Sequence, residues 1–553
     1  MPTWNLQADV VIVGSGGAAL SAAAAVVDQG ASALLLEAAE APGGTTRKSG
    51  GAFWIPNNSF MRRQGLMDPR ASALQLMARV SYPTLYTPEH PSLGLPPLQY
   101  ELLAAFYDNA APAIDRLTQL GAIDPVILGS YGFSPQAVSD PDYHSELPEN
   151  QAPHGRVLSA RTPPGSMQWP GVFLVEGMLA FLQKQGVPLL TKHRVTQVLT
   201  NALGEITGVE AEHEGSLRTV RARRAVVFGS GGFAHDPHKA RAFLRGPLFG
   251  SGSVPTSRGA FIDIASRLGA RLDNLANGFF YQAAIEDAAA QGGEVVRGDA
   301  HVFFPYGDST VVVNKQGNRV ANEKAPYHDR AQTHFHWSGK EYPHLVQFMI
   351  WDEAVAQEPT FWPWRGVVPL PGQESPLVLQ AQTLPELALR IEERLDRLRG
   401  QPFLSAAITP SLKLAPDFVS QLEETLQRFN TFAATGVDLD FHRGETALEQ
   451  AWQGPSRSTT GNRTLYPMSR TGPYYAAILG PATLDTCGGP AIDPDARVLR
   501  TDGSAIPGLY GAGNCIASPS GQAYWGAGGT LGPAMTFGFI AGRNAAREPL
   551  KAE

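Results

Sequence analysis

The chain has 553 residues, 43% of them hydrophobic and 17% charged, and a formal net charge of -7. This length predicts at least two domains with a large buried interior, and the negative charge argues against a nucleic-acid-binding surface, which needs a basic face. Two cysteines are too few for a disulfide framework, and the first residues show no cationic head before an apolar run, so we expect a cytoplasmic protein whose contact with membranes is at most peripheral.

The first predicted elements are a strand, a helix and a second strand. Residues 8–13 form a continuous apolar run that ends at glycines, which is typical of a buried parallel strand. Residues 18–29 are alanine-rich and helical, with Gly30 as the terminating glycine, and residues 33–37 form the next strand. A strand–helix–strand unit of this kind begins a parallel sheet, so the sequence predicts an α/β fold.

The turn between the first strand and the helix has the spacing of a dinucleotide-binding site. The sequence Gly14-Ser15-Gly16-Gly17-Ala18-Ala19 matches GxGxxG/A, in which small residues permit a tight turn, close approach of a pyrophosphate, and close packing of helix on strand. The free N–H groups at the start of the helix favour the phosphates. Glu37, at the end of the second strand, is suited to accept ribose hydroxyls. The alternatives are a turn without a ligand and a solvated Glu37.

Two further glycine-rich loops extend this site from a dinucleotide to FAD. Residues 43–46 and 49–51 form a loop rich in glycine and hydroxyl groups, and residues 511–514 form another before a helix at 529–544. Their separation along the chain indicates a long cofactor held from several places. No histidine lies in the first loop, so we expect FAD to be bound non-covalently. The expected FAD-binding residues are Gly14, Ser15, Gly16, Gly17, Ala18, Glu37, Gly43, Gly44, Thr45, Thr46, Ser49, Gly50, Gly51, Val195, Gly231, Gly513, Asn514, Gly529, Thr530 and Leu531.

The middle of the chain differs in composition from both ends. Residues 279–464 are rich in aromatic residues and proline, and they contain a charged helical stretch at 384–398. An apolar strand at 223–228 precedes this segment and ends in glycines, as the first strand does. We therefore expect a discontinuous, Rossmann-like FAD-binding domain of residues 1–278 and 465–553, with an inserted α+β catalytic or cap domain at 279–464.

Three tyrosine-containing segments carry a resemblance to a known family. They are Pro141-Asp142-Tyr143, Asn322-Glu323-Lys324-Ala325-Pro326-Tyr327 and Ser520-Gly521-Gln522-Ala523-Tyr524-Trp525-Gly526-Ala527-Gly528. Together with the N-terminal unit and the glycine-rich loops, these segments resemble the 3-ketosteroid Δ1-dehydrogenases, within the fumarate reductase and succinate dehydrogenase flavoprotein superfamily. The resemblance covers most of the chain in order and is weakest in its middle.

The resemblance implies FAD-dependent 1,2-desaturation of 3-ketosteroids. In this reaction Tyr327 would remove the alpha proton, and Tyr143 would stabilise the Tyr327 anion. The Tyr524 hydroxyl and the Gly528 N–H would donate to the ketone oxygen. The beta hydride would pass to the flavin, and the electrons would leave to an unidentified, quinone-like acceptor. No metal site is expected, because no cysteine or carboxylate spacing forms one.

Two departures from the family pattern leave the substrate open. Trp525 stands where the family often has proline, and the segment before Tyr143 is longer, so the shape of the pocket could differ. A smaller cyclic ketone is one alternative substrate. Alkene reduction of the fumarate reductase kind is a second alternative, but residues 484–489 lack the histidine that this branch carries before a Gly-Gly pair. A flavin-binding redox sensor without turnover is a third.

Overall fold

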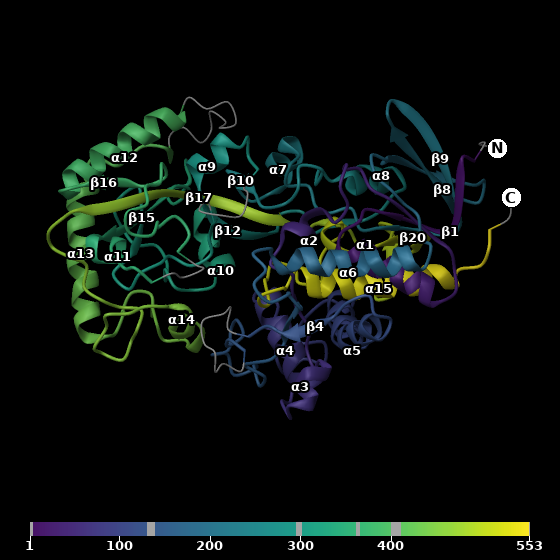
Figure 1. Ribbon diagram of the computed structural model, residues 1–553, viewed down its shortest axis with the longest axis horizontal. Helices are drawn as coiled ribbons and strands as arrows, with labels where there is room; N and C mark the ends of the chain where they lie inside the picture. Colours follow the sequence, from purple (N-terminus) through teal and green to yellow (C-terminus); the bar gives the residue numbers. More distant parts are fainter. Residues whose placement is uncertain (1–3, 130–138, 295–300, 361–364, 400–410, 552–553) are drawn as a thin grey trace.

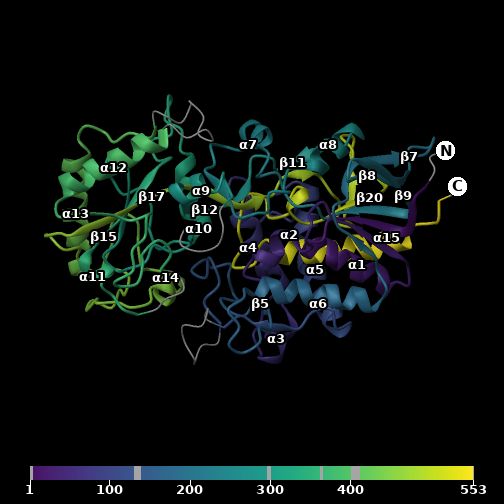
Figure 2. The same cartoon turned by 45° about the horizontal axis from the view of Figure 1, so that its top comes forward.

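The computed structural model describes residues 4–129, 139–294, 301–360, 365–399 and 411–551. The elements form two lobes, which Figures 1 and 2 show from two directions. One lobe contains the N-terminal unit and the end of the chain, and the other contains the middle of the chain. None of the helices within these ranges is long and apolar enough to cross a membrane.

The first lobe is built on an eight-stranded sheet. Its main path runs β19-β20-β9-β1-β2-β6, with β8 paired to β9 and β7 paired to β8. β1 pairs in parallel with β2 and with β9, and β9 pairs in parallel with β20. The parallel core confirms the predicted α/β class, because parallel strands need crossover helices that cover the sheet. The bounds of these strands are β1 Leu6–Val13, β2 Ala33–Leu36, β6 Leu189–Leu190, β7 Arg194–Thr200, β8 Ile206–His213, β9 Ser216–Phe228, β19 Arg497–Leu499 and β20 Ala505–Gly511.

Two helices from opposite ends of the chain pack tightly on this sheet. α1 (Gly17–Asp28) lies against α15 (Leu531–Arg547), and both are almost wholly buried. A Cβ at Gly538 would lie 2.3 Å from the Ala18 carbonyl oxygen, and a Cβ at Gly542 would lie 2.1 Å from that of Ala22. Only glycine permits this approach, which holds the C-terminal helix beside the dinucleotide-binding turn. α5 (Pro97–Gln119) and α6 (Pro170–Lys184) cover the same region (Figure 2).

The second lobe is built on a seven-stranded, mostly antiparallel sheet. Its main path is β13-β12-β17-β15-β14, and β10 and β16 also pair with β17. β17 (Tyr474–Thr486) is thirteen residues long, and Figure 1 shows it running from the far side of this lobe to the boundary with the first. α12 (Leu384–Arg399) and α13 (Phe418–Thr435) pack their apolar faces into the core of this lobe. β17 therefore delivers its C-terminal residues, Leu484 and Asp485, to the boundary between the lobes.

Short elements complete both lobes. They are α2 Gly44–Lys48, β3 Ala52–Trp54, α3 Ser59–Arg63, α4 Arg70–Ser81, β4 Pro125–Ile127, β5 Val157–Ala160, α7 Pro237–Phe243, β10 Gly250–Ser251, α8 Ala260–Arg267, β11 Leu272–Asp273, β12 Gly278–Ala284, α9 Ile285–Ala290, β13 His301–Val302, β14 Val311–Asn314, α10 Tyr327–Ala331, η1 Gln332–Phe335, β15 Gln347–Asp352, α11 Glu353–Ala356, β16 Leu379–Ala381, α14 Ala447–Trp452, β18 Gly489–Pro490 and η3 Gly513–Cys515. β3, β5 and β4 form a three-stranded sheet within the first lobe. The sheet of the second lobe takes β10 and β17 from outside the segment 279–464 that we expect to be inserted.

Candidate active site

The predicted turn after β1 opens into a large cavity. Gly14 has φ +106°, and a Cβ there would lie 2.5 Å from the Gly229 carbonyl oxygen, so this position requires glycine. The N–H of Gly17, the first residue of α1, donates to Thr46 Oγ1 at 2.9 Å. The start of α1, with its partial positive charge, therefore faces the cavity beside the loop that carries Thr46.

Glu37 is buried at the end of β2 and lines the same cavity. Its Oε2 accepts from Ser15 Oγ at 2.5 Å, and its Oε1 accepts from the Ala39 N–H at 2.7 Å. Ser15 Oγ in turn accepts from the Gly43 N–H at 2.9 Å. A carboxylate oxygen accepts more than one hydrogen bond, so Glu37 keeps acceptor capacity for a ribose while these bonds fix its orientation.

Glu37→Ala is expected to weaken FAD binding by about tenfold or more, since about 1.4 kcal/mol corresponds to a factor of ten. The substitution removes the ribose acceptor and leaves Ser15 without its carboxylate partner. The measurement is the FAD dissociation constant of refilled apoprotein, by flavin fluorescence. Glu37→Gln, which keeps the size of the side chain, is the control and should bind FAD more tightly than Glu37→Ala. An unchanged dissociation constant in Glu37→Ala would contradict the ribose role.

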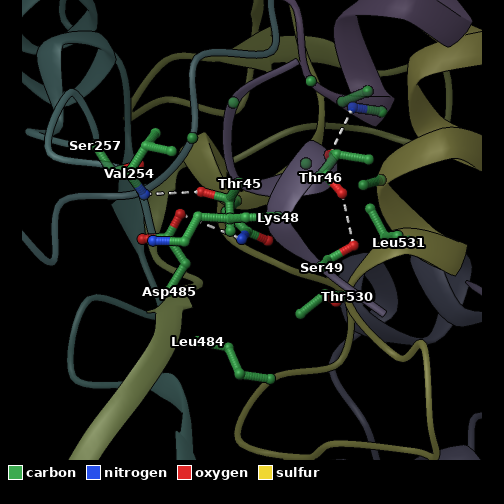
Figure 3. Close-up of a pocket in the computed structure, with 18 of the residues that line it drawn as sticks. Thr45, Thr46, Lys48, Ser49, Val254, Ser257, Leu484, Asp485, Thr530 and Leu531 are labelled. Carbon is green, nitrogen blue, oxygen red and sulfur yellow. Dashed lines mark hydrogen bonds between the residues drawn. The ribbon is translucent and has the colours of Figure 1, made fainter. Parts of the chain in front are cut away.

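The loop around α2 forms another wall of the cavity (Figure 3). Thr45 Oγ1 accepts from the Val254 N–H at 3.2 Å, whereas Ser49 Oγ donates to the Thr46 carbonyl oxygen at 2.7 Å. Gly51 has φ +63°, and a Cβ there would lie 2.5 Å from the backbone of Pro170. These hydroxyls therefore fix the loop in addition to facing the cavity.

All the expected FAD-binding residues except Gly43 and Gly529 line this cavity. A Cβ at Gly43 would lie 2.9 Å from Arg47 and Val175 side-chain atoms, so Gly43 closes the α2 loop onto α6. Gly529 N–H donates to the Gly526 carbonyl oxygen at 2.8 Å and so shapes the turn before α15.

Asp485 is a cavity residue that the sequence analysis missed. Its Oδ2 accepts from the Gly232 N–H at 2.9 Å and from Asn514 Nδ2 at 3.3 Å, and its Oδ1 accepts from the Thr486 N–H at 2.9 Å. Burial raises the pKa of this carboxyl to about 6 although these donors oppose the rise. The only sequence signal was a carboxylate within residues 484–489, the stretch that lacks the fumarate reductase histidine.

The Asp485 carboxyl is expected to make the stability of the protein depend on pH. Its ordinary pKa is 3.8 and its raised value is about 6. The protonated form therefore contributes stability that is fully present below pH 3.8 and is lost as the pH rises through about 6. Asp485→Asn cannot titrate, so wild type should lose roughly 2 °C or more of melting temperature relative to this variant between pH 4.5 and pH 7. Thermal unfolding at equal FAD occupancy measures the difference, and a constant difference would contradict this effect.

The structure brings the three predicted tyrosines together from distant segments. The ring centroids of Tyr143 and Tyr327 are 6.0 Å apart, those of Tyr143 and Tyr524 are 6.0 Å apart, and those of Tyr327 and Tyr524 are 5.4 Å apart. All three side chains are buried. Tyr327 is the first residue of α10, and Tyr524 precedes α15. Tyr327 and Tyr524 line the large cavity, and Tyr143 lines a small cavity next to it.

Tyr143 is held by a buried network of charges. The neighbouring Asp142 accepts from Trp54 Nε1 at 2.8 Å and from Arg156 Nη1 at 3.1 Å. Arg156 also pairs with Asp68 at 2.8 Å. Burial raises the pKa of Asp142, whereas Arg156 acts to lower it. This network fixes the backbone at Tyr143. Residues 130–138, in the segment before Tyr143 that is expected to be longer than in the family, lie outside the described part of the chain.

Gly528 lies directly beside the Tyr524 hydroxyl. The Gly528 N–H donates to Tyr524 Oη at 3.3 Å, so this N–H and the phenol are neighbouring donors. Gly528 has φ +85°, and a Cβ there would lie 2.5 Å from the backbone of Phe53. Trp525, the departure from the family pattern, points away from the tyrosines and donates from Nε1 to Ser81 Oγ at 2.8 Å. It therefore packs in the core of the first lobe and not against the cavity.

His328, next to Tyr327, joins α10 to the loop that carries Tyr524. Its Nδ1 accepts from the Phe280 N–H at 3.1 Å, and its Nε2 lies 2.9 Å from the Gln522 carbonyl oxygen. Burial lowers the pKa of this imidazole, so the ring is neutral at neutral pH. His328 therefore positions two of the tyrosine-bearing segments.

The remaining wall near the tyrosines is aromatic and apolar, and sequence analysis did not find it. It includes Leu128, His301, Phe303, Trp452 and Leu484. The Phe303 ring lies 4.8 Å from the Tyr327 ring, and the Tyr143 ring lies 5.6 Å from Trp452. These residues carry no motif, because only the folding of β13, β17 and α14 brings them together.

The chain matches the family model described as the FAD binding domain over residues 9–531. The chain belongs to this family. It is an FAD-dependent oxidoreductase, which confirms the cofactor and enzyme class that the glycine-rich loops predict.

Two curated relatives are similar over nearly the whole chain. A 4-oxocyclohexanecarboxylate 2-dehydrogenase of Sinomonas cyclohexanicum is 30% identical over 97% of this chain and 92% of its own length. A 3-oxosteroid 1-dehydrogenase of Mycobacterium tuberculosis is 29% identical over 96% of this chain and 97% of its own length. The predicted membership of the dehydrogenase branch of this flavoprotein superfamily is therefore confirmed.

The fold is also similar to that of a solved enzyme. The crystal structure of 3-ketosteroid Δ1-dehydrogenase from Sterolibacterium denitrificans, in complex with 1,4-androstadiene-3,17-dione, matches with a TM-score of 0.78. The two chains are 24% identical, and the match covers 98% of this chain and 99% of the other. The similarity shows that the two-lobed architecture is shared.

Proposed function

We propose that this flavoprotein removes two hydrogens from the 1,2-positions of a 3-ketosteroid. The observation that carries the proposal is the cluster of Tyr143, Tyr327 and Tyr524 in and beside the cavity that also contains the expected FAD-binding residues. FAD held there, without a covalent bond, supplies the acceptor for the beta hydride. The electrons then leave to a quinone-like acceptor.

Tyr524 and Gly528 are suited to bind the ketone oxygen. The Gly528 N–H donates to Tyr524 Oη at 3.3 Å, so a ketone oxygen that replaces Oη as the acceptor of this N–H can also accept from the Tyr524 hydroxyl. Negative charge grows on that oxygen when the alpha proton leaves, and donors placed in advance in a buried site stabilise it strongly. Binding the ketone in this way makes the alpha proton removable.

Tyr327 is the proposed base for the alpha proton. The proton passes to its phenolate oxygen, and the electrons of the broken C–H bond move into the enolate that Tyr524 and Gly528 hold. A free tyrosine has a pKa near ~10, so Tyr327 needs neighbours that stabilise its anion. Tyr143, whose ring meets that of Tyr327 edge to face, is the proposed first neighbour.

The character of the cavity favours a neutral, apolar substrate. Of its lining residues that the structure describes, only Lys48 and Arg194 are lysine or arginine. Lys48 pairs with Glu294 at 2.9 Å, and Arg194 lies beside His193 near the ribose end marked by Glu37. The aromatic wall around Phe303 and Trp452 offers stacking surface for fused rings and no cation for a carboxylate.

A smaller cyclic ketone is the second candidate substrate, because one relative at 30% identity is named for 4-oxocyclohexanecarboxylate. Anaerobic mixing of the purified enzyme with either ketone separates the two, with loss of flavin absorbance as the signal. We expect androst-4-ene-3,17-dione to reduce the flavin at least about tenfold faster. Faster reduction by 4-oxocyclohexanecarboxylate would replace the steroid assignment.

The same experiment tests the two remaining alternatives. A fumarate-reductase-like enzyme would oxidise chemically reduced flavin on addition of fumarate and would not respond to either ketone. A redox sensor would respond to none of the three compounds. Either result would overturn the proposed desaturation.

A further inference from the structure

Arg330 is a buried arginine one turn of α10 after the proposed base Tyr327. It is 2% exposed, and all its nitrogens donate to neutral oxygens. Nε donates to Gln282 Oε1 at 2.6 Å, and the Nη atoms donate to backbone carbonyl oxygens of the segments that surround the aromatic wall. These carbonyls belong to Glu323 (3.2 Å), Ala325 (2.9 Å), Val302 (2.9 Å) and Phe303 (3.4 Å).

Among the other buried arginines of the described ranges, Arg365 also donates only to neutral oxygens, whereas Arg156, Arg319 and Arg443 each have a carboxylate partner. Arg156 pairs with Asp68 and Asp142, and Arg443 pairs with Glu323 at 3.3 Å. Arg330 makes no ion pair with any carboxylate in the described ranges. A buried cation without a counter-ion is costly, and an anion that forms beside it offsets part of that cost.

The charged groups around Arg330 act on it from a distance, and none of those in the described ranges forms an ion pair with it. The Glu323 carboxylate is already bound by Arg319 and Arg443. Asp329, which precedes Arg330 on α10, is half-exposed and lies 3.8 Å from His144, and its carboxylate favours the charged form of Arg330 without pairing with it. Burial lowers the pKa of His334 to about 3, so this imidazole is neutral at neutral pH, and burial also lowers the pKa of Lys324 well below its ordinary value.

Arg330 lies three residues after Tyr327 on α10 and is close enough to Tyr143 to interact with it electrostatically. A negative charge on Tyr143 would favour the charged form of Arg330, and the interaction is mutual. Burial lowers the pKa of Arg330 to about 9, so the guanidinium remains a cation at neutral pH. Phe303, whose carbonyl accepts from Arg330, packs its ring on Tyr327 at 4.8 Å.

We propose that Arg330 is a positioning residue whose cation stabilises the tyrosinate form of the Tyr143–Tyr327 pair. The anion that Arg330 lacks in the resting site is the phenolate that removes the alpha proton. This role rests on the proposed function, because only a tyrosine base needs it. The ionisation itself can nevertheless be measured without turnover.

The test is a spectrophotometric titration of the FAD-loaded protein, which detects tyrosinate in the ultraviolet. For each protein, the titration curve of the same protein carrying Tyr327→Phe is subtracted. The remaining curve is that of the Tyr327 phenol alone. Arg330→Met, which removes the charge, is expected to raise the pH midpoint of this phenol by at least one unit. A midpoint within 0.2 units of wild type would overturn the proposal.

Gln282→Glu gives a second test that does not remove Arg330. The new carboxylate would face Arg330 Nε, where Gln282 Oε1 now lies at 2.6 Å, and would neutralise the cation in place. We expect the same upward shift of the phenol midpoint, whereas Gln282→Met, the control that adds no charge, should leave it unchanged. Equal shifts in both Gln282 variants would indicate a merely structural role and would overturn the proposal.

Failure of the proposed role of Arg330 and failure of the proposed desaturation give different combinations of results. If no ketone reduces the flavin but the phenol midpoint shifts as expected, the desaturation assignment fails and the electrostatic role of Arg330 stands. If ketones reduce the flavin and the midpoint does not move in Arg330→Met, the desaturation stands and the role of Arg330 is excluded.

Discussion

Tyr327→Phe is expected to lower the rate of flavin reduction by a 3-ketosteroid by at least about 100-fold, the lower range for loss of a general base. Phenylalanine keeps the ring that packs on Phe303 and Tyr524 and removes only the hydroxyl. The cavity and the expected FAD-binding loops are therefore unchanged. Flavin should remain bound at wild-type occupancy, so the loss reports the proton transfer and not the cofactor.

The measurement is anaerobic stopped-flow flavin reduction at saturating steroid. Tyr281→Phe is a matched control, because Tyr281 is a buried tyrosine of the same aromatic cluster that does not line the cavity. It should reduce flavin within about threefold of wild type. If Tyr327→Phe also reduced flavin within about threefold of the wild-type rate, Tyr327 would not be the base.

The parts of the fold that the sequence predicted are encoded by neighbouring residues. The run at 8–13, the glycine turn and the alanine-rich helix became β1, the turn at Gly14 and α1, with ends shifted by one or two residues. The predicted helices at 384–398 and 529–544 are α12 and α15. In each case the hydrophobic pattern and the terminating residues lie within or beside the element itself. Interactions between residues close in the sequence are therefore enough to determine that element.

The parts of the site that sequence analysis missed depend on contacts between distant segments. Asp485 reaches the cavity because β17 runs between the lobes, and its raised pKa comes from burial that no local pattern encodes. Phe303 and Trp452 join the tyrosines only through the packing of the second lobe. The cofactor contact that the motif predicts for Gly43 stays a prediction, and the structure adds a contact between distant segments, the packing of the α2 loop on α6.

Tyr524→Phe is expected to lower the rate of flavin reduction by roughly 100-fold, the loss typical of one oxyanion donor. The variant retains the Gly528 N–H, which in the wild type donates to Tyr524 Oη at 3.3 Å. One of the two donors to the ketone oxygen would therefore remain, and the rate should stay above that of a variant that lacks both. Flavin occupancy should be unchanged, since the phenyl ring still packs on Phe279 and Tyr327.

The pH dependence distinguishes loss of this donor from loss of the base. Tyr524→Phe lowers the rate at every pH and should leave the midpoint of the rising limb of the pH profile within about 0.5 units of wild type, because the base still titrates. Tyr327→Phe should abolish that limb, since its titrating group is gone. If the limb disappeared in Tyr524→Phe and persisted in Tyr327→Phe, the two roles would have to be exchanged. The rings of Tyr327 and Tyr524 are 5.4 Å apart and both line the cavity, so this comparison is what assigns the base and the donor.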